Sequence, residues 1–105
     1  MKKPVPGALF FTKTMLCLID KNNNGFILKK NVILMLYKIK DSASMRLNLK
    51  EKIDPNWDCW FLYDNILLYG HFVNANNDNQ FDFFLEELTE ENIERVYNDK
   101  ESNFN

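Results

Sequence analysis

Residues 57–73 read Trp57-Asp-Cys-Trp-Phe-Leu-Tyr63, then Asp64-Asn65, then Ile66-Leu-Leu-Tyr-Gly-His-Phe-Val73. Two apolar and aromatic runs are separated by two residues that tolerate a positive φ, which is typical of a β-hairpin with a two-residue turn. Because side chains alternate between the faces of a strand, this register assigns cross-strand pairs to each face. One face carries the pairs Trp57–Phe72, Phe61–Leu68 and Tyr63–Ile66. The other face carries the pairs Asp58–His71, Trp60–Tyr69 and Leu62–Leu67.

The segments before this hairpin also predict strands. Residues 9–19 and 26–39 are rich in apolar, β-branched and aromatic residues, and Asn24-Gly25 between them is a strong turn signal. Within the second segment, residues 32–37 show no 3.6-residue period, which favours a strand buried on both faces over an amphipathic helix. Residues 46–49 alternate polar and apolar side chains, the pattern of a half-buried strand.

The C-terminal third predicts one more strand and a helix. Phe81, Phe83 and Leu85 alternate along the chain as in a strand. A helix is predicted over residues 90–98, because Thr89 can cap it and two glutamates follow at the positive end of its dipole.

The apolar stripe of this helix consists of Ile93, Val96 and Tyr97, spaced to dock on the sheet. The sequence therefore predicts a mainly-β fold, a small barrel of about five strands with a short C-terminal α-helix. We expect residues 1–98 to form this single domain and residues 99–105 to form a flexible acidic tail.

Composition supports one packed domain with an uneven charge. The chain has 105 residues, of which 46% are hydrophobic and 14% aromatic, enough for a core without metal or disulfide. Residues 1–53 hold eleven Lys and Arg against three carboxylates, a net +8, whereas residues 54–105 hold two against twelve, a net −10. The halves are expected to neutralise each other across the fold. A basic binding face beside an acidic tail, or head-to-tail self-association, is the alternative.

Several classes of protein are excluded by what the sequence lacks. The apolar run after Met-Lys-Lys-Pro is too short for a signal peptide, and no run approaches transmembrane length. Cys17 and Cys59 are isolated and there is one histidine, so a zinc site is not expected. We expect an intracellular, cytoplasmic protein with free, buried thiols, no cofactor and no membrane partner. The many asparagines and lysines suggest AT-rich coding, as in a phage or a low-GC bacterium.

A pattern of short apolar motifs resembles the small SH3-like barrels of tailed phages and bacteria. The motifs are Pro6-Gly7-Ala-Leu-Phe10, Trp60-Phe-Leu-Tyr63, Leu68-Tyr-Gly70 and Phe83-Phe-Leu-Glu-Glu-Leu88. The resemblance spans roughly residues 6–90 and contains no diagnostic signature. It implies a binding or scaffolding role, such as that of a phage-encoded accessory or host-directed protein acting in the host cytoplasm.

One motif favours a different fold. Asp20, Asn22, Asn24 and Gly25 occupy positions 1, 3, 5 and 6 of an EF-hand calcium loop. Position 12 requires a bidentate glutamate, and here it is Asn31. A second candidate loop over residues 74–85 departs further from the pattern. The alternative hypothesis is therefore a degenerate EF-hand protein that binds calcium weakly or binds a helix, with Asp20, Asn22 and Asn24 as ligands.

Catalytic constellations are missing. His71 is predicted to lie opposite Asp58, an arrangement that we interpret as a structural cross-strand pair. The carboxylates of residues 86, 87, 90 and 91 are expected to point apart as surface charges, not to converge as two-carboxylate hydrolysis needs. We expect the protein not to be an enzyme.

Two sets of residues remain as candidate binding sites. The protein-binding candidates are Trp57, Trp60, Tyr63 and Tyr69, because Trp and Tyr dominate interaction hot spots. The nucleic-acid-binding candidates are Lys29, Lys30, Lys38 and Lys40, which are interleaved with aromatic residues. The sequence therefore predicts a non-enzymatic protein-interaction module, with a nucleic-acid-binding small barrel as a further alternative.

Overall fold

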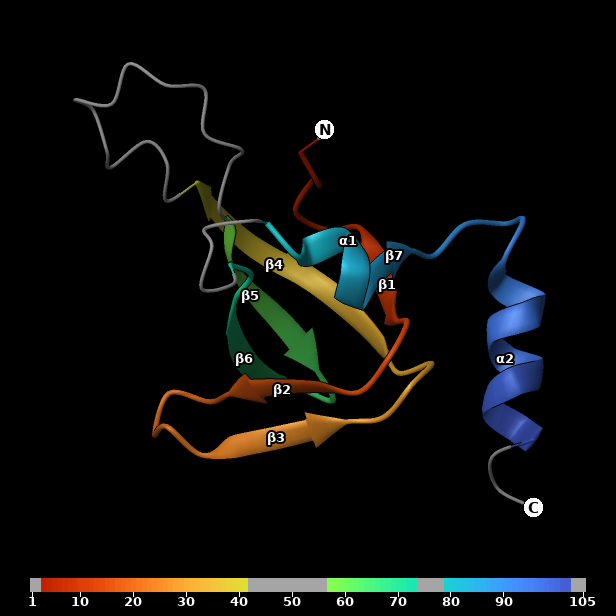
Figure 1. The fold of residues 1–105 in the computed structure, drawn as a ribbon, viewed down its shortest axis with the longest axis horizontal. Coiled ribbons are helices and arrows are strands. Elements are labelled where there is room, and N and C mark those ends of the chain that lie inside the picture. The colour runs from red at the N-terminus through yellow and green to blue at the C-terminus, as the bar shows by residue number, and fades with distance from the viewer. Residues whose placement is uncertain (1–2, 42–56, 74–78, 103–105) are drawn as a thin grey trace.

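The computed structural model describes residues 3–41, 57–73 and 79–102, and it shows a curled antiparallel sheet of seven strands (Figure 1). The strands are β1 (Leu9–Thr12), β2 (Leu16–Ile19), β3 (Gly25–Leu28), β4 (Ile33–Asp41), β5 (Trp57–Tyr63), β6 (Ile66–His71) and β7 (Leu85–Glu87). The helices are α1 (Phe81–Phe84) and α2 (Ile93–Ser102). The strand order is β3-β2-β6-β5-β4-β1-β7, a half-barrel. The predicted mainly-β class with a C-terminal helix is confirmed, but the strands outnumber the expected five.

The predicted hairpin is formed by β5 and β6 in the expected register. Asp58 pairs with His71, Trp60 with Tyr69 and Tyr63 with Ile66. Asp64 and Asn65 have φ values of 49° and 65°, as a type I′ turn requires at both central residues. The choice of turn residues therefore fixes which side chains share a face.

The two extra strands arise because both long apolar segments break at the same corner. Residues 9–19 divide into β1 and β2, and residues 26–39 divide into β3 and β4. At the corner, the buried Thr12 hydroxyl donates to the Lys29 carbonyl at 2.5 Å and accepts from the Val32 N–H at 2.9 Å. Asn31 takes a φ of 68°, which turns the chain there. The prediction of one strand per segment was wrong because this side-chain bonding holds a bend inside each.

Strand β4 has one buried face, not two. Leu34 and Leu36 are fully buried, whereas Tyr37 is 55% exposed. A register shift between Leu36 and Lys38 marks a bulge, after which Lys38 lies opposite Trp60. The prediction of a strand was correct, and its burial on both faces was wrong. The predicted strand over residues 46–49 lies outside the described residues.

The predicted final strand is largely replaced by the short helix α1. Phe81–Phe84 forms a helical turn, and only Leu85–Glu87 is extended. Phe81, Phe84 and Leu85 pack against the core, spaced as in a helix, while Phe83 is 62% exposed. The prediction of a strand from the alternation of Phe81, Phe83 and Leu85 was wrong, because a helical turn places Phe81 inside the half-barrel.

Phe81 lies at the centre of an aromatic cluster on the inner face of the sheet. Its ring centroid is 5.4 Å from that of Phe10, 5.3 Å from Trp57 and 5.2 Å from Phe72. All three contacts have edge-to-face geometry, which is favourable for aromatic rings. Phe81 therefore fills the interior that an open half-barrel would otherwise leave empty.

We predict that Phe81→Ala lowers the free energy of unfolding by about 3–5 kcal/mol, because it leaves a cavity among rigid rings. Phe83→Ala, on the same helical turn but exposed, should lower it by less than about 1 kcal/mol. Urea unfolding followed by circular dichroism measures both. Equal losses for the two variants would contradict the placement of Phe81 in the core.

Candidate protein-interaction face

The β5–β6 hairpin separates its side chains cleanly between an inner and an outer face. On β5, Trp57, Cys59 and Phe61 point inward and are at most 1% exposed. Asp58, Trp60 and Leu62 alternate with them and are half-buried. The alternation along the strand thus decides which side chains enter the core. The side chains between them lie on the outer face and do not contribute to the core.

An aliphatic row crosses the outer face over four strands. Cross-strand pairing joins Leu9 to Met35, Met35 to Leu62 and Leu62 to Leu67. Leu9 is 44% exposed and Leu67 is 40% exposed, while the two between them are half-buried. Four neighbouring strands therefore present one apolar stripe to solvent.

An aromatic row lies directly beside the aliphatic row. Pairing joins Lys38, Trp60, Tyr69 and Ile19 across β4, β5, β6 and β2. The Trp60 and Tyr69 rings lie 5.1 Å apart, and the Lys38 ammonium lies 5.4 Å from the Trp60 ring centroid. The bulge in β4 brings Lys38 opposite Trp60, so the cation–π contact depends on it. We call the aliphatic and aromatic rows together the outer apolar face.

A polar group borders the aromatic row. Asp58 Oδ1 accepts a hydrogen bond from the Tyr69 hydroxyl at 3.0 Å and also contacts His71 Nδ1. Burial, and then the hydrogen bond to Asp58, raise the pKa of Tyr69 to about 12. The hydrogen bond to Asp58 holds the Tyr69 ring against Trp60. The contact between Asp58 and His71 is the predicted cross-strand pair.

We predict a pH-dependent stability from Tyr69. Its folded pKa of about 12 lies above the unfolded value of about 10, so the folded state holds more protons between these pH values. The contribution is present below pH 10 and is lost as pH rises toward 12. Wild type should therefore lose more stability than Tyr69→Phe between pH 9 and about 11.5 in urea unfolding. Equal losses of stability in the two proteins would contradict a half-buried Tyr69 hydroxyl that donates to Asp58.

The two cysteines lie in different environments. Cys59 is buried on the inner face, and this burial, followed by the charge of Asp58, raises the pKa of its thiol to about 12. Cys17 is exposed on β2. The expectation that both thiols are buried was wrong for Cys17, because its position in the alternation of β2 points outward.

The four aromatic candidates divide between the two faces. Trp57 is 1% exposed and contacts Phe81, so it is a core residue and the proposal of a surface role for it was wrong. Tyr63 also lies on the inner face, partly buried against the core. Trp60 and Tyr69 remain on the outer face. The aliphatic row was missed, although the predicted Leu62–Leu67 pair was the signal that could have identified it.

The four lysine candidates do not form one patch. Lys38 and Lys40 are exposed on the outer face, opposite Trp60 and Asp58. Lys29 and Lys30 are exposed at the β3–β4 corner, at the other end of β4. Lys38 lies five residues after Ile33, where β4 begins, so the strand alone separates the two pairs by on the order of 15 Å. The structure therefore provides two separate pairs of cations.

The asparagine-rich loop is a β-hairpin connection. It joins β2 to β3, so the helix–loop–helix alternative was wrong. Asp20 Oδ1 accepts from the backbone N–H groups of Asn22 and Asn24, at 2.8 and 2.9 Å. The bond from Asn24 is the main cause that lowers the pKa of Asp20. In the described part of the chain, no group of three or more His, Cys, Asp or Glu residues could hold a metal ion.

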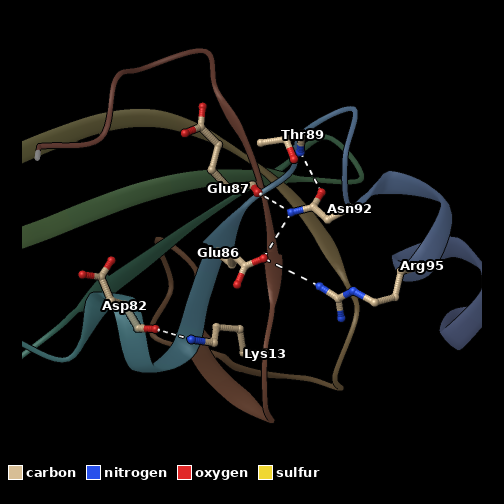
Figure 2. Close-up of polar contacts among 7 residues, drawn as sticks. All are labelled: Lys13, Asp82, Glu86, Glu87, Thr89, Asn92 and Arg95. Carbon is tan, nitrogen blue, oxygen red and sulfur yellow. Dashed lines mark hydrogen bonds and ion pairs between the residues drawn. The ribbon is translucent and has the colours of Figure 1, made fainter.

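Two residues of β7, Glu86 and Glu87, attach helix α2 to the sheet (Figure 2). Glu86 accepts from Asn92 Nδ2 at 3.1 Å and lies 3.7 Å from the Arg95 guanidinium. Asn92 Nδ2 also donates to the Glu87 carbonyl at 3.0 Å. The Arg95 guanidinium lies 5.7 Å from the Phe11 ring centroid. These contacts place α2 beside the Phe11 end of the outer face.

Helix α2 begins and ends later than predicted. It spans Ile93–Ser102, so it continues into the segment predicted as a tail. The capping contact also differs, because Asn92 Oδ1 accepts from the Thr89 N–H at 2.7 Å (Figure 2). Of the predicted apolar stripe, Val96 is fully buried, whereas Tyr97 is 47% exposed.

Comparison with known proteins found no match to any family model, curated protein or solved structure. Among the described residues, no helix has the length and apolarity needed to cross a membrane.

Proposed function

We propose that this protein is a non-enzymatic interaction module that binds a partner protein across the outer apolar face. The observation that carries the proposal is the joining of two rows, an exposed aliphatic row and the Trp60–Tyr69 row, on one side of the sheet. An apolar surface that continues over several strands is typical of an interaction site on a small protein.

The chemistry of the face favours a centre of Trp60 and Tyr69. Both rings are half-buried and held in place, Trp60 by Tyr69 and Lys38, and Tyr69 by its bond to Asp58. Ordered aromatic rings lose little conformational entropy on binding, and Trp and Tyr are enriched in hot spots. Leu62 and Leu67 lie next to them and would exclude water around this centre.

The charges beside the face favour an acidic rim on the partner. Lys38 and Lys40 are exposed at the β4 side, and the carboxylate of Asp58 is already bonded to Tyr69 and His71. We therefore infer a partner with an apolar patch bordered by carboxylates. Nucleic acid is less well supported, because Lys29 and Lys30 lie at the far end of β4.

The test compares substitutions on the two sides of the sheet. Trp60→Ser and Leu67→Ser alter the outer apolar face, whereas Phe83→Ser alters an equally apolar, exposed residue on α1, which covers the inner face. Proteins captured by the wild type from cells that produce it would be identified, purified and titrated by calorimetry. Each outer-face substitution should raise Kd at least about tenfold, and Phe83→Ser should leave it unchanged.

Circular dichroism and thermal melting would show that each variant is folded before its affinity is compared. A purified partner that binds Trp60→Ser and Leu67→Ser as tightly as the wild type would contradict the proposal. Loss of binding in Phe83→Ser alone would move the interaction site to the α1 side.

A further inference from the structure

The two edges of the sheet differ in how their backbone groups are used. At the β7 edge, the Leu85 N–H donates to the Phe81 carbonyl, and the Glu87 carbonyl accepts from Asn92 Nδ2. These contacts come from α1 on one side and from the turn before α2 on the other (Figures 1 and 2). The β7 edge is therefore covered in the way that natural proteins protect sheet edges.

The opposite edge, β3, has no such cover among the described residues. The Asp20 N–H donates to the Asn24 carbonyl, so Asn24 faces β2. Because hydrogen-bonded pairs alternate along an antiparallel ladder, Phe26 and Leu28 also face β2. The N–H and C=O groups of Gly25 and Ile27 consequently point away from β2. β3 is the last strand at this edge of the sheet (Figure 1). β3 itself contains no lysine, proline or bulge that would block pairing.

The side chains at this edge add an apolar and a basic element. Ile27 is 70% exposed, and Met15, directly before β2 and lining the same hollow, is 65% exposed. Lys21 lies before β3, and Lys29 and Lys30 lie directly after it, all exposed. The one carboxylate in this hairpin, Asp20, already accepts bonds from its own loop. Counting only the described residues, the edge therefore combines backbone groups that have no partner with positive charge that no carboxylate pairs.

We propose that β3 accepts an extended segment of a partner protein as an eighth strand. The segment has alternating apolar residues, which pack beside Ile27, and acidic residues at its ends, which pair with the lysines on either side of β3. Backbone bonds to Gly25 and Ile27 hold it, as in other cases of strand addition. A second copy of β3 fits less well, because it would bring two sets of these lysines together without a free carboxylate.

This site adjoins the Ile19 end of the outer apolar face but does not use the Trp60–Tyr69 centre of that face. The probe is the blocked peptide Glu-Glu-Val-Thr-Val-Thr-Val-Glu-Glu, and the matched control has lysine in place of every glutamate. Titration followed by amide NMR should show saturable shifts at Gly25 and Ile27 and slower solvent exchange of the Ile27 amide. The lysine-ended peptide should bind about tenfold more weakly, and the difference should shrink in molar salt.

Two variants test the mode of binding. Ile27→Pro removes an outward N–H without breaking the bonds between β2 and β3, and should weaken peptide binding about tenfold. Ile27→Val, which keeps the N–H, is its control. Lys29→Glu combined with Lys30→Glu should reverse the preference between the two peptides. Exchange rates in the wild type, with and without peptide, need no variant and keep the test valid if Ile27→Pro unfolds.

Absence of shifts at Gly25 and Ile27 at millimolar peptide would overturn the proposal, as would shifts confined to other strands. Protection of Ile27 that grows with protein concentration alone would show that a second copy occupies the edge, which also overturns it. Trp60→Ser should bind the peptide normally. A failure at the outer apolar face and a failure at β3 can therefore be told apart.

Discussion

The cross-strand register of β5 and β6 is the constraint on which the rest of the structure depends. The turn at Asp64 and Asn65 sets this register, because both residues adopt positive φ and close a two-residue loop. A slip of one residue would exchange the two faces of the hairpin. With the observed register, Phe61 and Trp57 meet Phe81 in the core, and Trp60 meets Tyr69 outside it.

The inner and outer faces then acquire different roles for physical reasons. The inner face is closed by Phe81, whose contacts with rings from several strands fill the half-barrel. In the part of the chain that the structure describes, only α2 lies against the outer face, at its Phe11 end, where Glu86 and Asn92 hold it. What remains is an apolar surface with ordered aromatic rings and two nearby cations. Its exposure offers no benefit to folding, which is why we assign it to binding.

Features that depend on neighbouring residues could be predicted from the sequence. The hairpin, its register and the Asp58–His71 pair follow from alternation and turn residues, and the structure has each of them. The corner at Thr12 and Asn31 could not be predicted, because it depends on bonds between residues distant in sequence. The helical turn at Phe81 was also missed, since burial overrode a strand-like pattern. The outer apolar face depends on pairing among β1, β2, β4, β5 and β6, which the sequence did not specify.

The most direct test of the two-faced hairpin uses the two tryptophans of the chain. Trp60→Phe leaves Trp57 as the one emitter, and Trp57→Phe leaves Trp60. Acrylamide, which is uncharged, should quench Trp60 several times more strongly than Trp57, and the Trp57 emission should lie at shorter wavelength. Equal quenching of the two, or stronger quenching of Trp57, would contradict the register and with it the assignment of the outer apolar face.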